Sequence, residues 1–120
     1  MSIEACLDEL VKSGIDDWVP DADVAWIAKS VAGARSPSEI HSTVLTLVAE
    51  ALRRGLMEIG EIFPPERGFR SWGLPVDAAV AKLESEWRSK AGRPLGGEIF
   101  WLRNTDTGRR RAKRLLPDAG

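Results

Sequence analysis

A long amphipathic helix that ends at a glycine and leads directly into a strand constrains the fold of this chain more than any other feature. Its start is marked by Ser36-Pro37-Ser38-Glu39, with a capping serine, a proline at the first helical position and a glutamate three residues after the cap. Apolar residues then recur every three or four positions, at Ile40, Val44, Leu47, Val48, Ala51 and Leu52. Because Gly55 supplies a stop, we predict a helix over about 37–54 and a strand over 56–62.

A second junction of strand and helix lies near the C-terminus. Residues 98–103 place Ile99 and Trp101 on one face of a strand and apolar side chains on the other, so both faces need cover. Thr105 is positioned to cap a final basic helix over 106–116.

The N-terminal part of the chain predicts two further helices separated by a short strand. Helical spacing of apolar residues favours a helix over 2–13. The pair Trp18-Val19 suits a short strand that Pro20 ends. A second helix then begins at Asp21 or Asp23.

An insertion at 63–96 separates the two C-terminal strands. Its first part, 64–75, is too rich in Pro and Gly to predict regular structure. A helix follows, with one apolar face, and we expect it to pack on one face of the strand 98–103. Six residues are expected to be largely buried: Val48, Leu52, Ile59, Val80, Trp87 and Trp101.

Length and composition fit one α+β domain over residues 1–120, with three N-terminal helices, a small antiparallel sheet and a C-terminal helix. No apolar run reaches the ~20 residues that cross a bilayer, and acidic residues stand where an export signal would carry Lys or Arg. We therefore expect a cytoplasmic protein without a membrane partner. Cys6, the single cysteine, is expected to be a small buried hydrophobe.

The order of these elements resembles the winged helix-turn-helix fold over nearly the whole chain. Leu52-Arg53-Arg54-Gly55-Leu56 resembles the end of that family's recognition helix entering its wing. Residues 101–108 are similar to the leucine-x-threonine-x-x-glycine junction that closes the wing in many bacterial regulators, with the threonine shifted by one position. An ordinary wing turns within a few residues, whereas this one holds a helix. Residues 68–72, 84–87 and 98–101 also resemble a group of small, uncharacterised bacterial proteins.

The sequence lacks the usual signatures of enzymes. It has no Cys/His pairs for zinc, no phosphate-binding glycine loop and no nucleophile elbow. Asp16, Asp17, Asp21 and Asp23 lack the spacing of a calcium loop and predict a solvated turn with a helix cap. We expect a non-enzymatic protein without a cofactor or a metal.

The resemblance implies DNA binding, and some residues would suit it. His41 and Ser42 lie at the start of the helix 37–54, where a winged helix would read base edges, and Arg35 lies in the turn before it. The last helix could meet phosphates through five cations: Arg109, Arg110, Arg111, Lys113 and Arg114. The same run also suits a solubilising terminal helix. Glu39 and Glu50 would repel phosphates, which disfavours groove insertion.

Protein association is the preferred hypothesis, with a homodimer and a protein that neutralises a partner as its two forms. Tryptophan and arginine are enriched at the energetic centres of interfaces. Arg67, Arg70 and Trp72 lie together in the insertion and predict a contact loop. By default, four tryptophans are expected to pack the insertion onto the strands, and Trp72 is the one of them expected to be partly exposed: Trp26, Trp72, Trp87 and Trp101. A DNA-binding transcriptional regulator is the alternative.

Overall fold

The capping sequence at Ser36 forms in full and starts the longest helix, α3 (Pro37–Arg53). The Ser36 hydroxyl accepts from the Glu39 backbone N–H at 3.1 Å, and the Ser36 N–H donates to the Glu39 carboxylate at 2.9 Å. That donation from the backbone holds the pKa of the Glu39 carboxyl below its usual value. The helix ends where Gly55 adopts a positive φ of 68°, so the predicted bounds are confirmed to within one residue.

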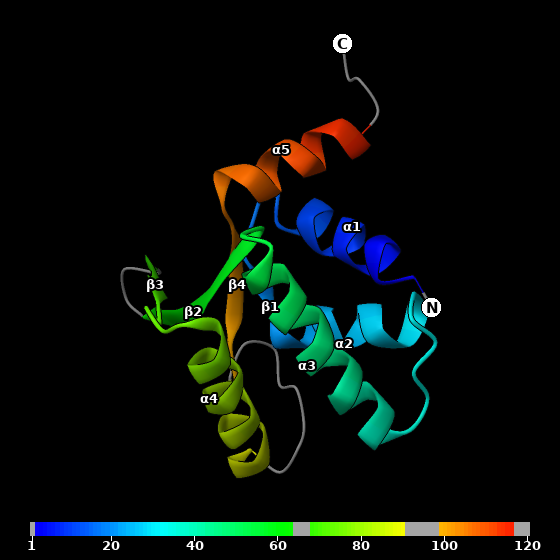
Figure 1. Ribbon diagram of the computed structural model, residues 1–120, viewed down its shortest axis with the longest axis vertical. Coiled ribbons are helices and arrows are strands. Elements are labelled where there is room, and N and C mark those ends of the chain that lie inside the picture. The colour runs from blue at the N-terminus through cyan, green and yellow to red at the C-terminus, as the bar shows by residue number, and fades with distance from the viewer. Residues whose placement is uncertain (1, 64–67, 91–98, 117–120) are drawn as a thin grey trace.

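The computed structural model describes residues 2–63, 68–90 and 99–116, and in these residues five helices accompany a four-stranded antiparallel sheet (Figure 1). The α+β class and the order of the predicted helices are therefore confirmed. The remaining elements are α1 (Ile3–Ser13), β1 (Val19–Pro20), α2 (Asp21–Ser30), β2 (Met57–Phe63), β3 (Gly68–Ser71), α4 (Val76–Ser89), β4 (Trp101–Asn104) and α5 (Asp106–Leu115).

The sheet has the order β1-β4-β2-β3, so chain neighbours are not always sheet neighbours. β2 pairs with β4 through Ile59 and Leu102, and it pairs with β3 along its other edge. β1 pairs with β4 through Val19 and Leu102. β4 and β2 therefore form the centre of the sheet, while β1 and β3 are its edges.

The prediction of no regular structure over 64–75 was wrong for residues 68–71, which form β3. The pairing depends on Gly60, because a Cβ atom at that position would lie 2.1 Å from the backbone oxygen of Arg70. A glycine in β2 therefore admits the close approach of a neighbouring strand. Parts of the insertion, 64–67 and 91–96, lie outside the described residues, as does Glu98 of the predicted strand.

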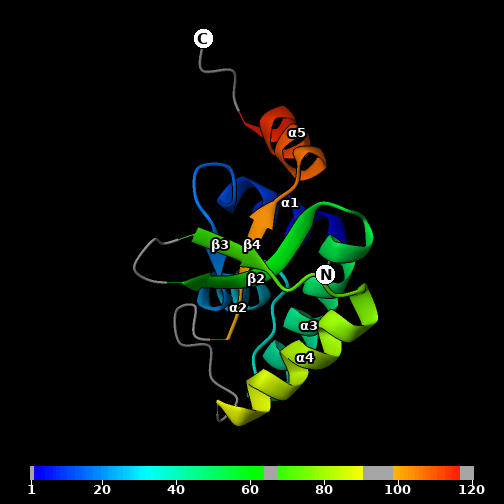
Figure 2. The same cartoon turned by 90° about the vertical axis from the view of Figure 1, so that its left-hand side faces the viewer.

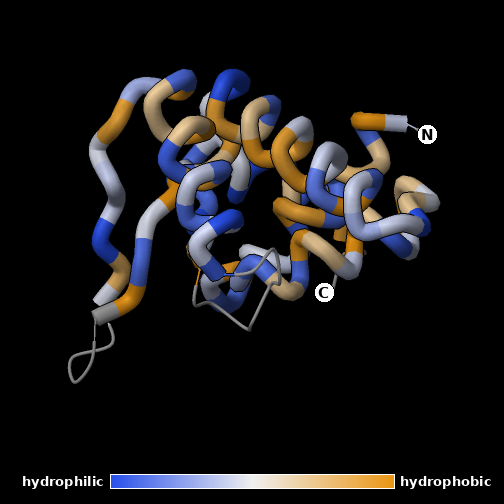
Figure 3. Tube along the Cα trace, turned by 90° about the horizontal axis from the view of Figure 1, so that it is seen from below, coloured by the Kyte–Doolittle hydropathy of each residue, from blue (hydrophilic) through white to orange (hydrophobic). Residues whose placement is uncertain are grey.

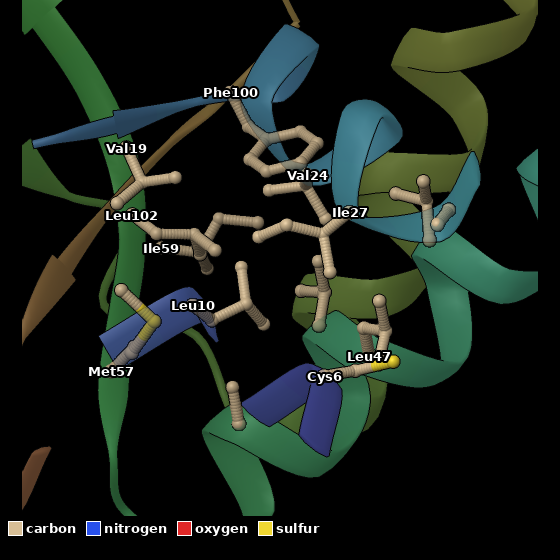
Figure 4. Close-up of a cluster of buried hydrophobic side chains, with 14 of the residues drawn as sticks. Cys6, Leu10, Val19, Val24, Ile27, Leu47, Met57, Ile59, Phe100 and Leu102 are labelled. Atoms are coloured by element: carbon tan, nitrogen blue, oxygen red, sulfur yellow. The ribbon is translucent and has the colours of Figure 1, made fainter. Parts of the chain in front are cut away.

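The core lies between the sheet and helices α1, α2 and α3. Figure 4 shows side chains of the strands, such as Ile59 and Leu102, facing Leu10 and Ile27 from the helices. Phe100 is the largest of the fully buried side chains, and Cys6 is buried as predicted. In Figure 3 the colour along the helices alternates between hydrophobic and hydrophilic within each turn, as expected for helices with one buried face.

Of the six residues expected in the core, Val48, Ile59 and Trp87 are buried. The other three, Leu52, Val80 and Trp101, are only half-buried. Leu52 lines an open groove near the end of α3, and Trp101 projects from the sheet face opposite the buried Phe100 and Leu102.

The insertion helix α4 packs mainly against α3, not on the strand 98–103 as predicted. Its apolar face buries Ala79, Leu83 and Trp87. The Trp87 ring stacks on His41 of α3 with a centroid separation of 5.1 Å. The physical reason for the difference is that α3 offers α4 an apolar helix to pack against, because it carries half-buried apolar residues beside those of the core: Ile40, Leu45 and Leu52.

Two buried polar side chains attach β4 to the N-terminal helices. The Asp21 carboxylate at the start of α2 accepts from the Ile99 backbone N–H at 2.8 Å. At the other end of β4, Asn104 donates through Nδ2 to the Val11 backbone oxygen at 2.9 Å. Burying a polar group without a partner is costly, so these two bonds favour the observed position of β4.

Replacing Ser36 with Ala should lower the free energy of unfolding by ~0.5–2 kcal/mol, because the Glu39 N–H loses its acceptor. Urea denaturation followed by circular dichroism measures the change. Ser38→Ala, two residues further along the chain and exposed, is the matched control and should change the free energy of unfolding much less. Equal midpoints for wild type and Ser36→Ala would contradict the capping role.

Replacing Leu83 with Ala should cost ~2–5 kcal/mol, because its fully buried side chain joins α4 to α3 and its removal leaves a cavity. Leu52→Ala should cost less, since Leu52 is already half-buried. The two values come from the same denaturation measurement. A loss at Leu83 no greater than that at Leu52 would mean that α4 contributes little to stability.

Candidate protein-binding surfaces

One face of the sheet is not covered by the described helices. In Figure 2, strands β2, β3 and β4 stand in front, and helices α1 to α3 lie on their far side. The register places Glu58 opposite Arg103, Gly60 opposite Trp101 and Ile62 opposite Phe69. These positions alternate with the core residues of each strand, so their side chains project from the uncovered face.

Aromatic and arginine side chains gather on that face, and we name Trp18, Phe69, Trp101 and Arg103 the aromatic sheet face. The rings of Trp18 and Phe69 are 6.2 Å apart between centroids and tilted by 39°. The Arg103 guanidinium lies over the Phe69 ring, 4.4 Å from its centroid, and also pairs with Glu58 at 3.2 Å. All four residues are half-buried, so each side chain still presents surface to solvent.

An open hollow of about 310 Å³ adjoins the aromatic sheet face. It is lined by Trp18, Arg103, Asn104, Arg109 and the loop 14–17. Two guanidinium groups and the carboxylates of Asp16 and Asp17 therefore surround one recess. Such mixed charges suit a polar segment of a partner better than an apolar small molecule.

The three residues of the predicted contact loop differ in where they lie and in how exposed they are. Arg67 lies outside the described residues. Arg70 is exposed on β3. Trp72 is half-buried, donates its backbone N–H to the Ile59 oxygen at 3.0 Å and holds the Lys82 ammonium 4.9 Å from its ring centroid. Trp72 therefore extends the β2–β3 pairing, and it presents part of its side chain to solvent, as the residues of the aromatic sheet face do.

The outer face of α3 carries hydroxyl groups and few free cations. Ser42 and Arg35 are exposed, and Ser42 lines a shallow hollow at the turn between α2 and α3. His41, which the resemblance to a winged helix would place against DNA, is half-buried against Trp87. Glu39 stays ionised because the capping bonds lower its pKa. The start of α3 therefore offers little to attract phosphate.

The basic helix α5 keeps only part of its charge free. Arg111 pairs with Asp8 at 2.8 Å and with Glu4 at 3.1 Å, which attaches α5 to α1. Arg109 pairs with Asp106 at 3.3 Å. In the described part of the chain, the cations of α5 without a carboxylate partner are Arg110, Lys113 and Arg114.

Two leucines at the end of α5 are exposed although they are apolar. Leu115 and Leu116 are each 39% exposed. Ala112 alone of the three is buried. Because α5 lies beside α1 at the edge of the molecule, only one side of this helix has a neighbour among the described residues to pack against (Figure 1).

Trp26 on α2 is the largest departure from the sequence prediction. It was expected in the core, but it is 59% exposed. The helical spacing of the buried residues Val24, Ile27 and Ala28 puts position 26 on the opposite side of α2, so the signal was present in the sequence. The size and apolar nature of tryptophan outweighed that spacing in the prediction.

A comparison with protein-family models, curated proteins and solved structures finds no match to this chain. The described residues contain no helix long and apolar enough to cross a membrane. They also contain no group of three or more His, Cys, Asp or Glu residues that could hold a metal ion. The proposed function is therefore based on the surfaces described above.

Duplex DNA should bind weakly, in the ~10⁻⁴–10⁻⁶ M range at ~150 mM salt, because only three cations of α5 lack a carboxylate partner among the described residues and Glu39 stands at the start of α3. If Arg110, Lys113 and Arg114 each neutralise one phosphate, the plot of log K against log salt has a slope no steeper than about −3. Fluorescence anisotropy over a salt series measures this slope. Removing these charges should flatten it, whereas the control Lys12→Ala should not. A nanomolar operator that loses affinity on replacing Ser42 or Arg35 would contradict the prediction.

Proposed function

We propose that this chain is a small, non-enzymatic protein-binding module on a winged-helix-like scaffold. It acts either as a homodimer or as an accessory protein that neutralises a partner. The aromatic sheet face carries the proposal, because it joins three aromatic rings to an arginine on a surface that the described helices leave open. Residues of these types dominate the binding energy of many interfaces. The cytoplasmic location expected from the sequence belongs to the same proposal.

The strand order supports the scaffold part of the proposal. β1 lies between α1 and α2 in the chain, yet it pairs with the last strand, β4, and α3 leads directly into β2. This is the arrangement that the resemblance to winged helices implies. β3 and α4 are then additions between β2 and β4, and β3 contributes Phe69 to the aromatic sheet face.

The local geometry suits the aromatic sheet face to binding a protein partner. Arg103 is held over Phe69 and by Glu58, so its guanidinium is ordered before a partner arrives. An ordered side chain loses less conformational entropy on binding. The adjoining hollow adds polar groups at the rim, which is the usual arrangement around an apolar interface centre.

DNA-binding regulation is the second candidate, and the exposed residues Arg35 and Ser42 together with the unpaired cations of α5 favour it. The paired state of Arg111 and the ionised Glu39 weigh against it. We therefore rank protein binding first.

Affinity capture with the immobilised chain tests the proposed function. Wild type and Leu115→Ala, an exposed apolar residue in the last turn of α5, should retain the same partner. Trp18→Ala and Phe69→Ala should each weaken that partner's binding about thirty-fold, since the removed rings are hot-spot residues. Calorimetry with the purified partner gives the dissociation constants. Two variants are needed because Phe69→Ala also touches the β2–β3 pairing.

Circular dichroism first establishes that each variant is folded. If the folded Trp18 and Phe69 variants bind every retained protein as tightly as wild type does, the aromatic sheet face is not the binding surface.

A further inference from the structure

The outer face of α2 carries a charge pattern centred on the exposed Trp26. Asp23 lies three residues before Trp26 and Lys29 three residues after it, and both are exposed. Three residues correspond to about 4.5 Å along a helix axis, so the two opposite charges flank the indole at equal distances. The helix thus presents a negative group, a large apolar ring and a positive group in order along one face.

These groups have no partners within the described residues. Neither Asp23 nor Lys29 has a carboxylate or cation within 4.0 Å, and Trp26 makes no ring or cation contact there. The positions one turn away on the same face, Ala22 and Ser30, are small. The indole therefore stands above its neighbours on α2, with room beside it for another large side chain.

We propose that α2 pairs with α2 of a second copy of this chain, antiparallel, about a two-fold axis beside Trp26. In that arrangement Asp23 lies level with Lys29 of the second copy, and Lys29 lies level with Asp23 of the second copy. A parallel arrangement would place like charges together. The pattern of this face is complementary to itself only when the helices run in opposite directions.

Packing directions support the same pairing. Helical side chains lean towards the N-terminus of their own helix, so Trp26 leans towards Asp23. In the antiparallel pair, that end of the helix meets the small Ser30 and the long Lys29 of the second copy. The ammonium of that Lys29 can pair with Asp23 and also lie over the indole. Both indoles lose water contact near the two-fold axis.

The association is reversible and weak. α2 has ten residues and is therefore about 15 Å long, which is short for the ~1,200–2,000 Å² that stable complexes bury. We expect a dimer that forms at high micromolar concentration and dissociates on dilution. This surface is distinct from the aromatic sheet face, so the pairing extends the proposed binding function without depending on the same residues.

Sedimentation equilibrium over a range of concentrations tests the proposal. Wild type should show a reversible monomer–dimer equilibrium, and Trp26→Ala should weaken it about thirty-fold or more. Folding should survive this change because the side chain is already exposed. Lys113→Asp on α5, outside the α2 face, changes the net charge as much as Lys29→Asp does. It is the control for charge and should dimerise like wild type.

Charge reversal separates the antiparallel pair from any other association. Asp23→Lys alone and Lys29→Asp alone should each fail to self-associate, since each places like charges level with one another. Mixing the two variants should restore a dimer, because every opposed pair is then of opposite sign. The double variant with both changes should dimerise by itself.

A wild type that stays monomeric at millimolar concentration would overturn the inference. A dimer that persists in Trp26→Ala, or two reversed variants that do not associate when mixed, would also overturn it. The variants Trp18→Ala and Phe69→Ala should dimerise normally, so a failure of partner capture by the aromatic sheet face would leave this result unaffected.

Discussion

The position of β4 depends on two buried hydrogen bonds, and the remaining structure is built around that strand. Asp21 holds its beginning through the Ile99 N–H, and Asn104 holds its end through the Val11 oxygen. β4 then pairs with β1 on one side and β2 on the other. Because buried polar groups without partners are costly, alternative registers of β4 would leave these side chains unsatisfied. The two bonds thus select one register among those that apolar contacts alone would allow.

This register decides which residues of the sheet remain accessible. With Phe100 and Leu102 turned into the core, Trp101 and Arg103 face the other way and join Phe69 and Trp18. A slip by one residue would exchange the two sets. α4 could have covered this face, but it packs against α3, where Trp87 stacks on His41. The insertion therefore adds an aromatic residue to the open face and removes His41 from solvent.

Ion pairing within the fold weakens the electrostatic case for DNA. Arg111 is held by Asp8 and Glu4, and Glu4 also meets Arg54 at the end of α3. The hydrogen bond from Arg54, followed by that from Arg111, holds the pKa of the Glu4 carboxyl below its usual value, so the Glu4 carboxylate remains charged beside these two arginines. Of the five cations at 109–114, Arg111 thus attaches α5 to α1, and Glu4 joins this pair to Arg54 at the end of α3.

Local signals in the sequence determined the helices, since caps, glycine stops and apolar spacing act over a few residues. The bounds of α3 followed from Ser36 and Gly55 in this way. Tertiary structure alone decided the existence of β3, because its pairing needs the close approach that Gly60 allows across the sheet. It also decided the surfaces: Arg111 is neutralised by residues far away in the chain, and Trp18, Phe69 and Arg103 meet only through the strand order. Such contacts join distant segments, and no local pattern in the sequence encodes which segments meet.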